Sequence, residues 1–84
     1  MILDATSRAI LDFEQAWTTA HPSGSITGKG EAIRTALSIT PVRYYQLLGR
    51  LIDDAGASAA YPQLCARLRR IRDDRAAARA RRMS

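Results

Sequence analysis

The chain of 84 residues has few of the side chains on which most catalytic and metal sites depend. It contains one cysteine and one histidine. A single cysteine cannot form a disulfide within the chain, and these two residues cannot supply the ligands of a zinc site. No glycine-rich phosphate loop and no paired nucleophile and base is evident. We therefore expect a protein that is not an enzyme and that uses no metal and no cofactor.

Long apolar runs are also lacking. The longest run is far too short to span a bilayer, and Asp4 interrupts the apolar start of the chain, unlike a signal peptide. A chain of this length buries a modest core and leaves little room for a substrate cavity. We expect a single-domain cytoplasmic protein whose partners include neither a membrane nor a small-molecule substrate.

Lysine is nearly absent, but arginine is abundant and unevenly placed. Of the 13 basic residues only Lys29 is not arginine. Residues 67–84 hold eight arginines and two aspartates, a net charge of +6, whereas residues 1–66 have a net charge of −1. The guanidinium fork suits phosphate oxygens and guanine edges. Nucleic acid is the commonest partner of such a tail, and an anionic membrane is the second interpretation.

The N-terminal part predicts a helix over residues 4–20, with Asp4 as its N-cap. Ile10, Phe13 and Trp17 recur at steps of three and four residues, which places them on one side of that helix. Leu11 lies off this apolar stripe, so we expect it to be exposed.

The middle of the chain predicts two helices separated by a tight break. Residues 21–30 form a loop by their glycine, serine and proline content. A short helix near 31–37 precedes a third helix over 41–54, for which Thr40 is the N-cap and Pro41 fits the first turn. The intervening break of about three residues is typical of a helix-turn-helix.

The C-terminal part predicts a fourth helix that opens at Pro62, after a weak helix or turn over residues 55–60. Leu64, Leu68 and Ile71 give this helix an apolar stripe. From Arg72 to Arg82 only alanine and charged residues occur, so no side of the helix can be buried. That stretch is either a projecting helix or a tail that orders on binding.

The fold class predicted from these elements is all-α. We expect a four-helix compact domain that contains a helix-turn-helix and ends in an arginine-rich C-terminal helix or tail. The helix-turn-helix domain covers residues 1–71, and a basic C-terminal extension covers 72–84. Within the arginine-rich part over residues 67–84, ion pairs between Arg69 and Asp73 and between Arg70 and Asp74 would offset only two arginines, leaving the others on several sides of the helix.

The third helix has an apolar and a polar side when its residues are placed at 100° steps. The apolar side, expected in the core, holds Tyr44, Leu47, Leu48, Leu51 and Ile52. The other side and its flanks carry Val42, Arg43, Tyr45, Gln46, Gly49 and Arg50. Gln can pair with adenine, Arg with guanine or phosphate, and Val with a thymine methyl. Asp53, at the far end of this side, would repel phosphate.

This pattern predicts a non-enzymatic protein that binds double-stranded DNA, with a recognition helix over 41–54 and phosphate contacts from the arginines. The predicted protein is either nucleoid-associated or a small transcriptional regulator. In the recognition helix and its cap, the predicted contacts are Thr40, Val42, Arg43, Tyr45, Gln46 and Arg50. In the C-terminal part, they are Arg67, Arg70, Arg72, Arg75, Arg79, Arg81 and Arg82.

Other interpretations of the same residues stay open. An ordinary surface helix can also carry Arg and Gln. A protein-interaction module would use the helix over 41–54 to dock on transcription machinery or another partner, with the tail on an acidic surface; RNA is a third partner. A lone helix-turn-helix usually gains specificity by dimerising, but the sequence presents no clear seam for a homodimer.

Several strings along the chain resemble a family of small actinobacterial and phage proteins catalogued as a domain of unknown function. The strings are Ile10-Leu11-Asp12-Phe13-Glu14 with Trp17, Ala32-Ile33-Arg34, Arg43-Tyr44-Tyr45-Gln46, Leu51-Ile52-Asp53 and Arg67-Leu68-Arg69-Arg70. The resemblance covers most of the chain. It implies a compact helix-turn-helix protein with a basic C-terminus that binds DNA, as nucleoid-associated members do.

Overall fold

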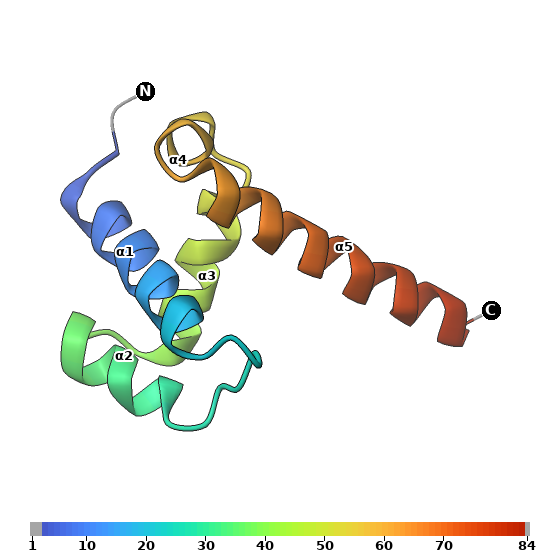
Figure 1. The fold of residues 1–84 in the computed structure, drawn as a ribbon, viewed down its shortest axis with the longest axis horizontal. Helices are drawn as coiled ribbons and strands as arrows, with labels where there is room; N and C mark the ends of the chain where they lie inside the picture. The colour runs from blue at the N-terminus through green and yellow to red at the C-terminus, as the bar shows by residue number, and fades with distance from the viewer. Residues whose placement is uncertain (1–2, 84) are drawn as a thin grey trace.

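The computed structural model describes residues 3–83, which form five α-helices and no strand (Figure 1). The helices are α1 (Ala5–Ala20), α2 (Lys29–Leu37), α3 (Pro41–Leu51), α4 (Ala55–Ala60) and α5 (Pro62–Met83). The all-α class is confirmed. There is one helix more than the four expected, because residues 55–60 form a complete short helix. None of these helices is long and apolar enough to cross a membrane.

Local side-chain caps set where the first and third helices begin. The Asp4 carboxylate accepts a hydrogen bond from the Ser7 backbone N–H at 2.7 Å, and this bond lowers the pKa of Asp4. The Thr40 hydroxyl accepts from the Arg43 N–H at 3.1 Å, and Pro41 occupies the first turn of α3. Both predicted caps are confirmed, because each satisfies a backbone donor that the helix itself leaves unpaired.

The predicted end of the third helix at residue 54 is wrong by three residues. Asp54 is the N-cap of α4, and its carboxylate accepts from the Ala57 N–H at 3.0 Å. α3 therefore ends at Leu51 and the chain turns before α4. α2 likewise begins at Lys29, two residues before the expected Glu31.

The buried cluster wraps around α1 rather than following one stripe. Leu11 has an exposed fraction of 0%, so the expectation that it faces solvent is wrong. The cluster that contains it extends to Ala57 in α4 and to Leu64 and Cys65 in α5. A wider arc of α1 is covered than spacing within that helix alone indicates. Cys65 is a free cysteine in this core, and its burial raises the pKa of the thiol.

α5 packs against α4 at its beginning and then projects away from the other helices (Figure 1). It continues unbroken past Ile71 to Met83, which is the projecting helix of the two alternatives considered for this stretch. The division of the chain into units 1–71 and 72–84 stays a prediction; residues 1, 2 and 84 of those units lie outside the described residues.

Candidate nucleic-acid interface

The polar side of α3 is uncovered. Val42 has an exposed fraction of 67% and Tyr45 of 45%, and Arg43, Gln46 and Arg50 are also exposed. At Gly49 an added Cβ would meet no heavy atom within 4 Å. Because these side chains are exposed and nothing lies over Gly49, this side of α3 can approach a flat or grooved partner.

The opposite side of α3 lies in the core, as its spacing predicts. Tyr44 has an exposed fraction of 0%, and Leu48, Leu51 and Ile52 are buried with it. Leu47 is half-buried and packs against the cluster. The orientation of α3 therefore follows from burial of one apolar side.

A buried polar triad, formed by Glu14, Lys29 and Tyr44, ties α3 to α1 and α2. The Lys29 ammonium lies 2.7 Å from Glu14 Oε1, and the Tyr44 hydroxyl donates to the same oxygen. Glu14 and Lys29 each have an exposed fraction of 5%. Burial of Tyr44, followed by its hydrogen bond to Glu14, raises the pKa of the phenol. Side chains from α1, α2 and α3 thus meet at the Glu14 carboxylate, and these contacts fix the orientation of α3 relative to α1 and α2.

Sequence reasoning assigned no role to Glu14 or Lys29, although a signal was present. Glu14 lies four residues after Ile10 and three before Trp17, so it falls on the apolar stripe of α1. Carboxylates are almost never fully buried unless they are paired, and a carboxylate on such a stripe therefore indicates a buried partner. Lys29, which we assigned to a loop, is that partner at the start of α2.

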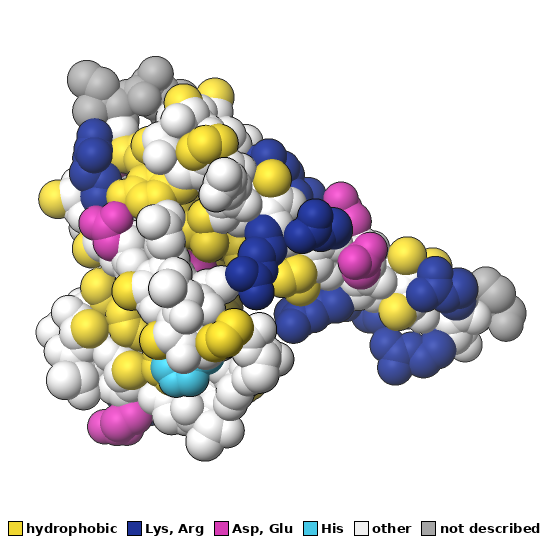
Figure 2. Space-filling view, viewed as in Figure 1, with side chains coloured by type: hydrophobic (Ala, Val, Ile, Leu, Met, Phe, Trp, Pro, Cys, Tyr) yellow, Lys and Arg dark blue, Asp and Glu magenta, His cyan; other side chains and the backbone are white. Residues whose placement is uncertain are grey.

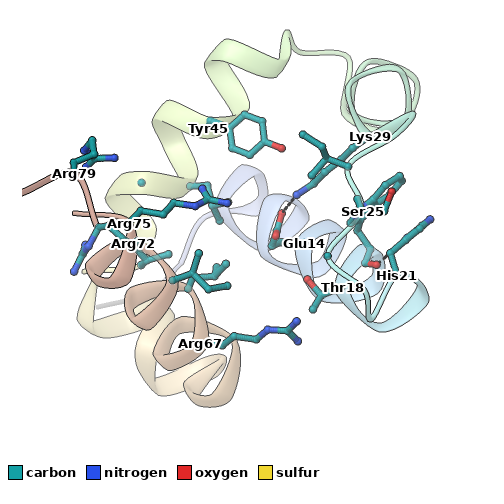
Figure 3. Close-up of a pocket in the computed structure, with 18 residues that line it drawn as sticks. Glu14, Thr18, His21, Ser25, Lys29, Tyr45, Arg67, Arg72, Arg75 and Arg79 are labelled. Atoms are coloured by element: carbon teal, nitrogen blue, oxygen red, sulfur yellow. Dashed lines mark hydrogen bonds and ion pairs between the residues drawn. The ribbon is translucent and has the colours of Figure 1, made fainter. Parts of the chain in front are cut away.

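α5 presents most of its arginines on one side. Arg67, Arg72, Arg75 and Arg79 all line a groove between α5 and the rest of the molecule (Figure 3). At 100° per residue, Arg82 falls on the same side, Arg70, Asp73 and Arg81 fall on the other side, and Asp74 lies at the boundary next to Arg67. Figure 2 shows basic side chains clustered where α5 leaves the body and along its length.

Arg72 is already engaged by carboxylates. Its Nη1 donates to Asp53 Oδ2 at 2.7 Å and its Nε donates to Asp73 Oδ1 at 3.3 Å. These bonds, that to Asp53 first, raise the pKa of Arg72. Asp53, which we expect to repel phosphate, also binds Arg72 and so holds α5. Of the predicted phosphate contacts, Arg72 is thus the one with a carboxylate partner in the described residues.

The pairs of Arg69 with Asp73 and of Arg70 with Asp74, considered as an alternative for α5, are not formed in the part of the chain that the structure describes. Arg69 reaches across to the preceding elements, where its Nη1 donates to the Ile52 carbonyl at 2.7 Å and to the Ser58 hydroxyl at 2.9 Å. Arg69 is half-buried, and it closes the junction of α3, α4 and α5 instead of pairing with Asp73. Arg70 is exposed.

The remaining predicted contact residues lie at the two ends of this surface. Thr40 is exposed while its hydroxyl caps α3, and Arg81 and Arg82 are exposed in the last turn of α5. Among residues 3–83, no three His, Cys, Asp or Glu side chains are placed to hold a metal ion.

The chain belongs to the family described as protein of unknown function (DUF3263), whose model matches residues 2–80. No curated protein and no solved structure matches it. The family description carries no activity.

Proposed function

We propose that this member of the DUF3263 family is a non-enzymatic protein that binds double-stranded DNA. In this proposal α2, Ser38–Thr40 and α3 form a helix-turn-helix. The outward side of α3 contacts base edges, and the arginines of α5 contact phosphates. The protein acts either as a nucleoid-associated protein or as a small transcriptional regulator.

The connection between α2 and α3 supports the helix-turn-helix assignment. Only Ser38, Ile39 and Thr40 separate the two helices, and α1 packs against both. Ser38 has a φ of 58°, in the left-handed region. Turns of this motif often use glycine because that conformation disfavours side chains. The first half of α3, which makes most base contacts in such proteins, exposes Val42, Arg43 and Gln46.

The observation that carries the proposal is the ion pair between Asp53 and Arg72. Asp53 lies two residues after the end of α3, in the turn before α4. Because Arg72 binds Asp53 at 2.7 Å, α5 passes beside the C-terminal end of α3, and Tyr45 and Gly49 of α3 line the same groove as Arg75 of α5. The two elements proposed to touch DNA are therefore neighbours on one surface, and a duplex lying on α3 has the arginines of α5 beside its backbone.

The charge of α5 matches a phosphate backbone. Within residues 3–83, no ion pair involves Arg67, Arg75 or Arg79. Neutralising phosphates with such side chains releases condensed counterions, which dominates the affinity of small DNA-binding proteins. Base contacts from α3 then add discrimination between sequences.

The decisive experiment is a titration of the intact protein against two duplexes of unrelated sequence at low salt. We expect measurable affinity for both, and a matched pair of double variants localises it. Arg75→Ala with Arg79→Ala should weaken binding. Arg8→Ala with Arg34→Ala, which removes the same charge from α1 and α2, should do so much less. No duplex affinity at low salt would refute the proposal and favour docking of α3 on a protein.

A measurement of genome-wide DNA occupancy then separates the two proposed roles. Broad coverage of the genome indicates a nucleoid-associated protein, and a few peaks indicate a transcriptional regulator.

A further inference from the structure

The groove beside α5 has an apolar interior. It has a volume of about 650 Å³ and lies between α5 on one side and α1, the loop that follows it and α3 on the other (Figure 3). Trp17, Leu68 and Ile71 line it and are half-buried, and Ile26 at its edge has an exposed fraction of 69%. A polyanion alone gains nothing from this apolar surface, so the groove offers more than phosphate binding requires.

The wall of the groove that α5 forms combines apolar side chains, Leu68 and Ile71, with a row of guanidinium groups. Arg67 and Arg75 extend from α5 across the groove, and Arg79 lies at its outer end (Figure 3). From Arg67 to Arg79 the helix rises by about 18 Å, at 1.5 Å per residue. Leu68 and Ile71 lie between these arginines on the same side of α5. We name the six side chains Trp17, Leu68, Ile71, Arg67, Arg75 and Arg79 the arginine groove.

We propose that the arginine groove is the docking site for an acidic amphipathic helix of a partner protein. An apolar stripe on that helix would cover Trp17, Leu68 and Ile71, and its carboxylates would face the arginine row. This is the helix-in-groove mode of recognition, with charge complementarity setting the partner. A row of about 18 Å matches roughly three turns of a partner helix. The inference does not depend on DNA binding by α3, but it uses Arg67, Arg75 and Arg79, which the proposed function assigns to phosphates, so a duplex and the partner helix would compete for these arginines.

Three other occupants fit the groove less well. Single-stranded nucleic acid needs free aromatic faces, but His21 stacks on Trp17 at a centroid distance of 3.8 Å and the Lys29 ammonium lies 5.3 Å from the centre of the Tyr45 ring. A small anion cannot bridge three arginines spread over about 18 Å. In a second copy of this chain, the helix available to enter the groove is α5, whose positive charge would be repelled by the row of arginines.

The only tryptophan of the chain is Trp17, so its fluorescence reports on the groove of the intact protein. The probe is a synthetic helical peptide of about 14 residues, with leucines at i, i+3, i+4 and i+7 and glutamates at most other positions. The control peptide has the same composition in scrambled order. We expect a saturable blue shift of the Trp17 emission with the patterned peptide and affinity about tenfold weaker for the scrambled one.

Two charge-reversal variants test the place of binding. Arg79→Glu reverses a charge on the groove side of α5. Arg81→Glu makes the same change of charge two residues later, which is about 200° away around the helix and therefore on the other side. Because both residues are exposed in the last turns of α5, neither change should unfold the protein, and circular dichroism checks this. We expect Arg79→Glu to weaken the patterned peptide about tenfold and Arg81→Glu to weaken it about twofold at most.

Equal binding of both peptides, equal loss in both variants or no binding at all would overturn the proposal. A different result would also overturn it: oligo(dT) shifts the Trp17 emission, Arg79→Glu abolishes that shift, and the patterned peptide has no effect. The groove would then bind single-stranded DNA. Arg43→Ala, on the outward side of α3, should leave peptide affinity unchanged. The DNA-binding proposal and this one can therefore fail separately.

Discussion

Arg72 and Asp53 form an ion pair, with Nη1 2.7 Å from Oδ2, that joins the projecting helix α5 to the end of α3. The two residues are 19 positions apart in the chain. The contact places a negative charge and a masked arginine at the border of the proposed DNA surface. In the proposed function we therefore expect this pair to limit affinity for DNA as well as to orient α5.

Asp53→Asn should therefore strengthen binding to a duplex. The change removes a charge that repels phosphate and releases Arg72, while Arg69 still holds α5 through the Ile52 carbonyl. We expect affinity to rise about threefold to tenfold at low salt, on the scale of one added phosphate contact. Asp74→Asn is the matched control, because Asp74 is exposed and forms no ion pair within the described residues. Equal gains in both variants, measured by fluorescence anisotropy, would mean that net charge alone matters.

The buried triad should contribute far more to stability than the exposed ion pair of α2. Lys29→Met leaves the Glu14 carboxylate buried without its cation, which costs about 3–5 kcal/mol. Adding Glu14→Gln should recover part of that loss, because the uncompensated charge is removed. Arg34→Met breaks the exposed pair with Glu31 and should cost less than about 1 kcal/mol. Urea unfolding measures all four free energies, and a similar loss for Lys29→Met and Arg34→Met would contradict the assignment.

Features set by near neighbours in the chain could be predicted from the sequence. Asp4 and Thr40 cap helices because their side chains reach a backbone N–H three residues ahead. The two sides of α3 follow from the helical period alone, and Tyr44 is buried as that period predicts.

Features that join distant segments could not be predicted from the same patterns. Glu14 and Lys29 are 15 residues apart, and no local period connects them. Leu11 belongs to a buried cluster that extends to Ala57 in α4 and to Leu64 and Cys65 in α5, so its burial depends on the arrangement of the whole chain. The same holds for the arginine groove, whose walls come from α1 and α3 on one side and α5 on the other, with Arg72 and Arg69 helping to anchor α5.

Arg43→Ala and Gln46→Ala should each weaken duplex binding without changing the melting temperature. Both side chains are exposed on the outward side of α3, so their removal leaves the core intact. The loss of a good base contact should cost about 1–3 kcal/mol and relax preference at one base pair. Gln15→Ala, an exposed amide on α1, is the control. Unchanged affinity in both α3 variants would remove α3 from the groove of the duplex.

Truncation after Ile71 should leave the fold intact and weaken DNA binding. Beyond that residue all side chains of α5 are exposed or half-buried, and the one ion pair to the body is that of Arg72 with Asp53 within the described residues. Circular dichroism should show a melting transition like that of the intact chain, with helical signal lost only in proportion to the residues removed. Loss of the transition would mean that residues after 71 belong to the folded unit.

The dependence of DNA affinity on salt tests the assignment of the arginines to one side of α5. If the protein neutralises about six phosphates, log K should fall against log salt with a slope near −5, since each contact contributes roughly −0.9. Replacing Arg75, Arg79 and Arg82 by alanine should flatten that slope by up to about three units, because all three fall on the side of α5 that borders α3. Replacing Arg70 and Arg81, on the other side, should flatten it by less than about one unit. A slope near zero in the intact protein would refute phosphate binding by α5. Equal flattening per arginine on both sides would instead mean that α5 acts as a diffuse positive charge, with no particular side against the duplex.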